Sequence, residues 1–149
     1  MKCKLICVQL PRLGLKNDRE TEQQLQDFSD KHGYSFIRRD RACGRRGGGV
    51  AICYEPARSQ MSRIKLPPTK NEIIAAIGRR VGQRRKIAVI AVYLPPAMRA
   101  DQIRRCLKDT NDSILHIKHK YADPYILLAG DFNKKLSVQL WLIILRSRQ

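Results

Sequence analysis

Two polar side chains directly follow an apolar run near the end of the sequence. The stretch ILLAGDFN, residues 126–133, places Gly130, Asp131 and Asn133 after four apolar residues. A carboxylate can accept a proton, position a water or ligate a cation, and an amide can orient a water or a phosphate oxygen. The alternative is an Asx-turn, in which Asp131 only caps its own backbone. This stretch alone leaves both interpretations open.

A phenol and a group of arginines occur in two earlier segments. The run KIAVIAVYLPP brings Tyr93 to the end of an apolar stretch just before two prolines, which make a rigid exit that would hold the phenol at a sheet rim. The segment RRDRACGRRGGG, residues 38–49, contains a glycine triplet and five arginines. These are Arg38, Arg39, Arg41, Arg45 and Arg46. Guanidinium groups and the backbone amides of a flexible loop bind phosphates together. The alternative is that Arg39 and Arg41 pair with acids such as Asp40, while the glycines only permit a tight turn.

The overall charge points to the same class of ligand. The chain of 149 residues has 30 Lys and Arg against 13 Asp and Glu, a net charge of +17. Such a field favours a polyanion as partner, because the excess charge otherwise opposes compactness through self-repulsion. A solvated basic surface is the alternative. The same two interpretations apply to a second basic cluster, residues 79–86, at the tip of an expected hairpin.

Alternating helix and strand patterns surround these residues. A helix is expected over residues 18–33, from the possible cap Asp18 to Gly33. Strand patterns follow at residues 34–41 and 50–55. Residues 71–94 fit a β-hairpin with a somewhat long loop, although the alanines leave a helix open for its first arm. Residues 125–129, apolar on both faces, are typical of a central strand.

An amphipathic helix is expected between the hairpin and the last strand. Its apolar residues recur at spacings of four and three. They are Ile103, Leu107, Thr110, Ile114, Ile117 and Tyr121. Arg104, Arg105 and Lys108 then face outward. The alternation of strands and helices predicts one α/β domain with a modest core.

Cysteine usage and the chain ends bear on the cellular compartment. The five cysteines are odd in number and scattered, which fits free thiols in a reducing compartment. The N-terminal apolar run is too short for a signal peptide, and the C-terminal run VQLWLIIL is too short to span a bilayer. We therefore expect a soluble intracellular chain, located in the nucleus, with no membrane association.

Three segments in the same order resemble a known family. They are RDR…GRRGGGVAIC at residues 39–53, IAVIAVYLPP at 87–96 and ILLAGDFN at 126–133. In these the chain resembles the endonuclease/exonuclease/phosphatase superfamily, and within it the endonuclease domain of LINE-type non-LTR retrotransposons. The resemblance covers residues 16–135. It leaves an N-terminal flank, 1–15, and an apolar C-terminal tail, 136–149, that do not look like the family.

The resemblance implies a fold and a chemistry. The fold is an α/β, two-sheet αββα sandwich, here partial. The chemistry is Mg²⁺-dependent hydrolysis of a phosphodiester in DNA, without a small-molecule cofactor, to expose a 3′ end that primes reverse transcription. By motif, Asp131 would orient or deprotonate the attacking water. Asn133 would hold that water and a phosphate oxygen, and Tyr93 would bind the phosphate. Apart from the resemblance, the charge and the glycine-rich turn make Arg39, Arg41, Arg45 and Arg46 the expected DNA contacts, with the ion-pair alternative above still open.

The sequence departs from the family pattern where the metal should be held. Family members have a metal-binding glutamate at the end of an early strand, but Gly14 and Leu15 stand in the corresponding place. Glu20 and Glu22 follow on the expected helix, and the metal ligands are thus unassigned. The family also continues to a Ser-Asp-His motif, whereas this sequence ends sixteen residues after Asn133 without a histidine there. The three histidines, His32, His116 and His119, lie upstream on expected helices.

These departures lower the expected activity and stability. Groups that act as one catalytic unit do not contribute additively, so we expect a truncated endonuclease domain with little or no activity. A sandwich without some of its strands exposes apolar edges, which predicts a marginal, aggregation-prone fold. The alternative function is a basic nucleic-acid-binding remnant that does no chemistry.

Overall fold

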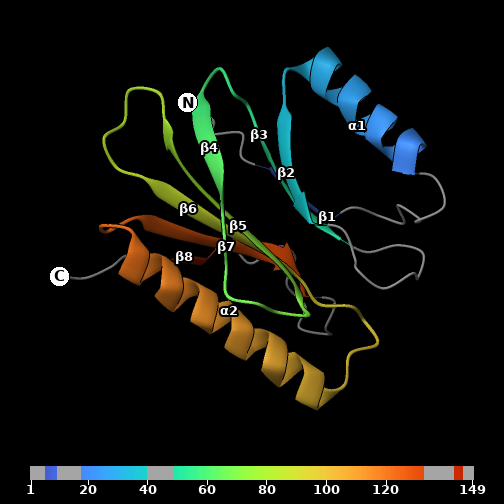
Figure 1. Cartoon of the computed structure of the whole chain (residues 1–149), viewed down its shortest axis with the longest axis vertical. Coiled ribbons are helices and arrows are strands. Elements are labelled where there is room, and N and C mark those ends of the chain that lie inside the picture. Colours follow the sequence, from blue (N-terminus) through green and yellow to red (C-terminus); the bar gives the residue numbers. More distant parts are fainter. Residues whose placement is uncertain (1–5, 10–17, 40–48, 133–142, 146–149) are drawn as a thin grey trace.

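A three-stranded sheet and a five-stranded sheet lie face to face, with one helix outside each (Figure 1). This computed structural model describes residues 6–9, 18–39, 49–132 and 143–145. The layers run α1, small sheet, large sheet, α2, which confirms the expected αββα arrangement of an α/β protein. None of the helices in these ranges is long and apolar enough to cross a membrane.

The small sheet is antiparallel, with β3 (Val50–Tyr54) between β1 (Ile6–Gln9) and β2 (Ser35–Arg39). Helix α1 (Asp18–His32) packs on its outer side (Figure 1). The ring of Phe28 on α1 lies 6.0 Å from that of Phe36 on β2, centroid to centroid. The helix ends where expected, because Gly33 takes a φ of +68°, a conformation that costs glycine no Cβ clash.

The large sheet has the strand order β4-β5-β6-β7-β8. Its strands are β4 (Ser59–Ile64), β5 (Glu72–Arg80), β6 (Ile87–Tyr93), β7 (Tyr125–Asp131) and β8 (Ile143–Leu145). Strands β6 and β7 are parallel, and the other neighbouring pairs are antiparallel. A parallel pair needs a long crossover, and α2 (Ala100–Lys120) provides it.

Two apolar layers form the core, one on each face of the large sheet. Side chains alternate along a strand, so β6 sends Ile90 toward α2 and Val89 toward the small sheet. The layer beneath α2 includes Cys106 and Ile117 of the helix. The layer between the sheets includes Ile52 of β3. Because both faces are covered, strand β6 is buried along nearly its whole length.

The expected hairpin is confirmed. Its first arm is a strand and not the helix that the sequence had left open. Residue Ala75 of β5 pairs with Ile90 of β6, so the first arm is not helical. Strand β5 continues to Arg80, which makes the turn shorter than the sequence suggested. Strand β4 was not expected, because its exposed polar and basic side chains give no apolar signal.

The expected amphipathic helix is confirmed, but one residue predicted for its buried face is exposed. Cys106 is fully buried, whereas Leu107, placed on the apolar stripe from its spacing, is 50 % exposed. The inward residues are Cys106, Thr110, Ser113 and Ile117. Thr110 and Ser113 are tolerated inside because each hydroxyl donates to a backbone carbonyl one turn earlier, at 2.8 and 2.7 Å.

Strands β1 and β8 lie in the two segments that do not resemble the family. Strand β1 belongs to residues 1–15 and pairs with β3, and β8 belongs to residues 136–149 and pairs with β7. The boundaries of the resemblance at residues 16 and 135 remain predictions, as does the tendency to aggregate. The exposed Arg63 on the edge strand β4 is of the kind that discourages edge-to-edge pairing.

The central strand gives a first prediction, about stability. Ile90 is fully buried in β6, so Ile90→Ala should lower the free energy of unfolding by about 2–5 kcal/mol through reduced burial and a residual cavity. Urea denaturation followed by circular dichroism measures this change. Val81→Ala is the control, since Val81 is 65 % exposed and should change stability by less than about 0.5 kcal/mol. Equal effects of the two changes would contradict the assigned core.

The two described free thiols give a second prediction. Burial raises the pKa of Cys53 to about 11, and burial with the nearby Asp109 carboxylate raises the pKa of Cys106 to about 11. Only the thiolate reacts with iodoacetamide. At pH 8 both cysteines should therefore stay unlabelled in the folded protein and react after unfolding in urea, as read by peptide mass spectrometry. Labelling of either one in the folded chain at the rate of a free thiol would be inconsistent with this burial.

Candidate active site

The parallel pairing of β6 and β7 brings two of the predicted site residues together. Tyr93 is the direct partner of Asp131 in the register, and the amide of Leu94 donates to the carbonyl of Asp131 at 2.9 Å. The two strands run the same way, so their C-terminal ends meet at one edge of the sheet. The apolar runs before Tyr93 and Asp131 thus fix both residues at that edge.

Both side chains point toward the space between the sheets. Direct partners in a ladder share a face, and alternate residues along a strand do as well. Val89 and Ala91, in phase with Tyr93, belong to the core layer between the sheets, and Leu127, in phase with Asp131, packs against that layer. Tyr93 is buried and Asp131 is half-buried. The pair therefore lies at the end of the interior between the sheets, where solvent still reaches the carboxylate.

A third residue, Glu72, extends this pair into a row that the sequence did not reveal. Glu72 on β5 is the direct partner of Tyr93 and faces the same way. Its carboxylate accepts a hydrogen bond from the amide of Gly49, just before β3 of the other sheet. We refer to these three as the Glu72–Tyr93–Asp131 row. The hairpin was the only sequence signal, and it was insufficient, because its exact register is needed to place Glu72 opposite Tyr93.

Gly130 has a specific role beside this row. A Cβ at this position would lie 1.9 Å from the carbonyl oxygen of Val92 on β6, far inside contact distance. The glycine is therefore required by close approach of two backbones. It allows β7 to stay paired up to Asp131.

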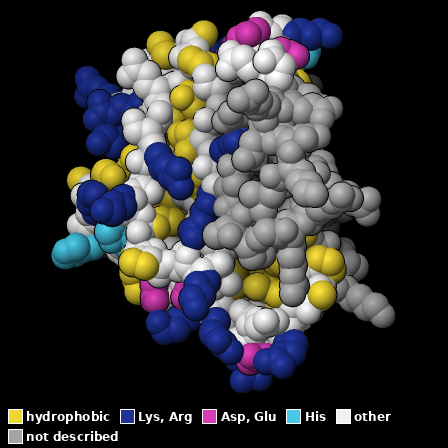
Figure 2. Space-filling view, turned by 45° about the vertical axis from the view of Figure 1, so that its right-hand side comes forward, with side chains coloured by type: hydrophobic (Ala, Val, Ile, Leu, Met, Phe, Trp, Pro, Cys, Tyr) yellow, Lys and Arg dark blue, Asp and Glu magenta, His cyan; other side chains and the backbone are white. Residues whose placement is uncertain are grey.

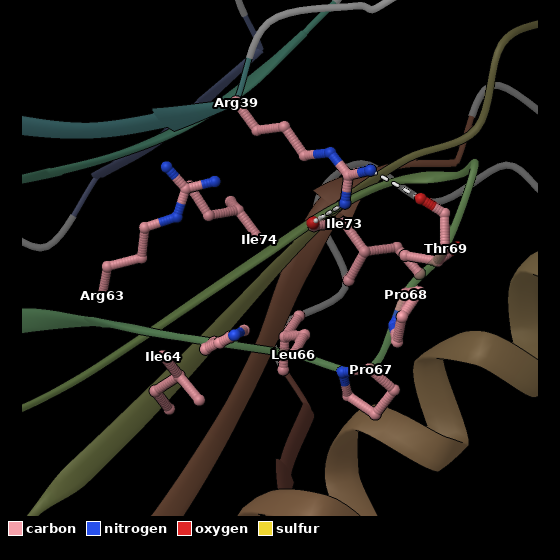
Figure 3. Close-up of a pocket in the computed structure, with 10 residues that line it drawn as sticks. Arg39, Arg63, Ile64, Leu66, Pro67, Pro68, Thr69, Ile73 and Ile74 are labelled. Carbon is pink, nitrogen blue, oxygen red and sulfur yellow. Dashed lines mark hydrogen bonds between the residues drawn. The ribbon is translucent and has the colours of Figure 1, made fainter.

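Arg39 joins the two sheets near the row. Its Nη1 donates to the carbonyl of Ile73 at 3.1 Å, and its Nη2 donates to the carbonyl of Thr69 at 2.6 Å (Figure 3). These contacts tie the end of β2 to the segment on either side of Glu72. Carbonyl oxygens carry no net charge, so these bonds orient the guanidinium without neutralising it. Contact of Arg39 with a phosphate remains a prediction.

A groove of about 480 Å³ opens beside Arg39. Arg39, Arg63 and Lys65 supply its cationic side chains, from β2, β4 and the segment after β4. Leu66 and Pro67 contribute apolar surface (Figure 3). This combination suits a ligand with an anionic group and an apolar or aromatic part, such as a nucleotide unit.

The segment before Glu72 is held against α2 by a small polar network. The Thr69 hydroxyl and the Asn71 amide group, the latter at 2.7 Å, both donate to the carboxylate of Asp109. The backbone amide of Asn71 donates to the Thr69 hydroxyl at 3.0 Å. A fixed segment here limits the freedom of the adjacent Glu72, and rigid support of this kind is what a catalytic or binding residue needs.

Four predicted residues, Asn133, Arg41, Arg45 and Arg46, lie outside the described residues. Arg39 and Gly49, which flank residues 40–48, both contact the segment around the row.

Glu20 and Glu22 lie on α1 as expected. His116 and His119 lie near the end of α2, where the chain returns to start β7, and so at the opposite end of the sheet from the row.

The donor set of the row fits a magnesium ion held by few protein ligands. Within the described ranges, no three His, Cys, Asp or Glu side chains form a cluster suited to a metal. Mg²⁺, however, commonly takes one or two carboxylates and completes its shell with water and substrate phosphate. Asp131 and Glu72 are the carboxylates of the row, and both are hard oxygen ligands of the kind it prefers.

Comparison with known proteins identifies the fold. No protein-family model and no curated protein matches this sequence. Among solved structures, the human Nocturnin catalytic domain with bound sulfate is similar with a TM-score of 0.64 and 17% identity, over 89% of this chain and 52% of that one. An endonuclease/exonuclease/phosphatase family protein from Bacteroides thetaiotaomicron gives a TM-score of 0.60 and 15% identity, over 79% and 48%.

A third similar structure is that of D. rerio TDP2 complexed with a single-strand DNA product. Its TM-score is 0.55 and its identity 18%, over 88% of this chain and 48% of that one. The chain thus has the fold of endonuclease/exonuclease/phosphatase proteins, as the three motifs predicted. It spans about half the length of the structures it matches.

The close approach at Gly130 gives a third prediction. Gly130→Ala should lower stability by well over about 1 kcal/mol and shift Asp131 away from Tyr93, because the methyl group collides with the backbone of β6. Gly82→Ala is the comparison: no atom lies within 4 Å of a Cβ there, so only its positive φ adds strain, about 1 kcal/mol. Urea unfolding ranks the two variants. A smaller loss of stability for Gly130→Ala than for Gly82→Ala would refute the proposed close approach.

Proposed function

We propose that this chain, with its endonuclease/exonuclease/phosphatase fold, is a Mg²⁺-dependent phosphodiesterase-type domain that acts on DNA at the Glu72–Tyr93–Asp131 row. The observation that carries the proposal is the register of β6 and β7, which sets a phenol beside a carboxylate at the open end of the space between the sheets. A general base and a hydrogen-bond donor on rigid strands are what attack on a phosphodiester requires.

Each residue of the site has a role in this proposal. Asp131 orients a water and accepts its proton as the oxygen bonds to phosphorus. The Tyr93 phenol donates to a non-bridging phosphate oxygen, where negative charge builds up in the transition state. The resemblance assigns Asn133 to the same water and phosphate oxygen. The bond to the 3′ oxygen breaks, that oxygen takes a proton from solvent, and the products are a 3′ hydroxyl and a 5′ phosphate.

Magnesium would be held by one carboxylate of the row, Glu72 when Asp131 acts as the base. When bound, it supplies positive charge that neutralises the phosphate and the leaving oxygen. Glu72 is the residue that this proposal adds to the family pattern. Its carboxylate accepts a hydrogen bond from Gly49, which places Glu72 where the two sheets meet. Within the large sheet, Glu72 lies on the strand next to that of Tyr93.

Charge favours DNA as the substrate. The net charge of +17 and the cations around the groove suit a phosphodiester backbone. Figure 2 shows Lys and Arg side chains spread over the coloured part of one face, with Asp and Glu mainly toward its upper and lower ends. Together with the three motifs, this supports a retrotransposon-type endonuclease domain, which would meet chromosomal DNA in the nucleus.

The proposed activity is low. Gly14 and Leu15 stand where the family has its metal-binding glutamate, and removal of one member of a catalytic unit eliminates most of the rate. The second candidate, a domain that binds DNA without cleaving it, is favoured by the same basic groove. The two candidates differ in whether Asp131 contributes to a chemical step.

Cleavage under enzyme excess tests the proposal. The purified chain should nick supercoiled plasmid slowly in Mg²⁺ and not in EDTA. Asp131→Ala should abolish the residual Mg²⁺-dependent nicking, because the general base is lost, while DNA binding stays equal or tightens slightly as a negative charge is removed. Tyr93→Phe should reduce the rate and leave the protein folded.

The matched control is Asp112→Ala, which removes an exposed carboxylate that pairs with Lys108 on α2. It should nick at the rate of the unmodified chain. Nicking that persists unchanged in Asp131→Ala would contradict the site. A folded chain that binds DNA and gives no Mg²⁺-dependent product would establish the second candidate instead.

A further inference from the structure

A second basic hollow lies at the other end of the large sheet. It has a volume of about 420 Å³ and is formed by the β5–β6 turn and the segment between α2 and β7. Its lining residues are Arg79, Arg84, Arg85, Lys86, Ala122 and Asp123. We call it the hairpin-tip pocket. Strand β6 is seven residues long, starts beside this pocket and ends at Tyr93, so the pocket lies roughly 20 Å from the row.

Arg85 is held in place within this pocket. Its Nε donates to the carbonyl of Asp123 at 3.1 Å, and its Nη2 pairs with the carboxylate of the same residue. The guanidinium carbon also lies 4.2 Å from the ring centre of Tyr125. Two hydrogen bonds and a stacked ring fix the group before any ligand arrives, which reduces the entropic cost of binding.

The pocket contains more positive than negative charge. Four cationic side chains line it, and Asp123 is its one carboxylate among the lining residues. Lys86 is half-buried and its Nζ lies 5.7 Å from the ring centre of Tyr121, while Arg84 is exposed. Cationic side chains that line one pocket repel each other, and an anion bound among them reduces that repulsion. Guanidinium groups favour phosphate because their paired donors match its oxygens.

We propose that the hairpin-tip pocket binds a phosphate group. This phosphate group belongs either to the backbone of a nucleic acid or to a free polyphosphate. The site is separate from the row, because one phosphate cannot contact both ends of a strand of seven residues. It does not depend on whether the row cleaves DNA. If the source is a nucleic acid, the pocket gives the chain a second contact point on the strand.

Paired variants test this site against general charge effects. Arg84→Ala with Arg85→Ala removes two cations from the pocket. Arg104→Ala with Arg105→Ala removes two exposed cations from α2, where Arg105 also pairs with a carboxylate, that of Asp101. Each double variant lowers the net charge equally. Binding of a short fluorescent single-stranded oligonucleotide is followed by anisotropy over a range of salt concentrations, with inorganic tripolyphosphate as competitor.

We expect the pocket variant to bind the oligonucleotide at least about tenfold more weakly than the α2 variant, because it loses charge-assisted hydrogen bonds to phosphate. The slope of log affinity against log salt concentration should become shallower by about 0.7 for each phosphate that the variant no longer binds. If tripolyphosphate competes in the unmodified chain and not in the pocket variant, the pocket takes phosphate from either source. If it competes in neither, while the affinity difference remains, the source is the nucleic-acid backbone. Equal affinities of the two double variants for both ligands would overturn the proposal.

A variant that should bind more tightly provides a further test, because a folding defect cannot produce a gain of affinity. Asp123→Asn removes the pocket's negative charge and keeps an oxygen that can accept from Arg85, and asparagine tolerates the φ of +38° at this residue. It should bind phosphate ligands several-fold more tightly than Asp112→Asn, which changes the net charge equally on α2. Arg84→Ala alone, at an exposed position, should weaken binding without lowering stability. No gain for Asp123→Asn over its control would count against the pocket.

Discussion

The parallel pairing of β6 with β7 is the constraint on which the rest of the site depends. It sets Tyr93 beside Asp131, and it persists to the last residue of both strands because Gly130 lets the two backbones approach. A parallel pair requires the crossover helix α2, which covers one face of the sheet and leaves the other to the small sheet. The row is thus confined to the end of the space between the sheets, where a side chain is held firmly and still meets solvent.

Excess positive charge shapes the remaining surface. A net charge of +17 opposes compactness, and the fold accommodates it in two ways. Arg39 is bound by carbonyl oxygens that orient it and leave its charge in place, so it both joins the sheets and faces the groove. At the opposite end, Arg85 is fixed by Asp123 and Tyr125. The two basic hollows lie at opposite ends of the large sheet.

Much of this architecture could be predicted from the sequence, because its signals are local. The apolar runs before Tyr93 and Asp131, the hairpin and the helix at residues 100–120 each follow from periodicity and turn residues. The motif order then predicted the fold. Glu72 could not be identified in this way because its place beside Tyr93 depends on the register of the hairpin. Strand β4 carries the polar pattern of an exposed edge, and the choice between Cys106 and Leu107 as the buried neighbour depends on how α2 is rotated against the sheet.

The central claim is that the Glu72–Tyr93–Asp131 row binds a phosphodiester and a divalent ion. A crystal structure of the chain with Mn²⁺ and a phosphorothioate oligonucleotide tests it most directly, because anomalous scattering locates both the metal and the sulfur. The account predicts a metal bound by the carboxylate of Asp131 or Glu72, and a phosphate oxygen within hydrogen-bonding distance of the Tyr93 phenol. An oligonucleotide bound only elsewhere, with no metal at either carboxylate, would contradict it.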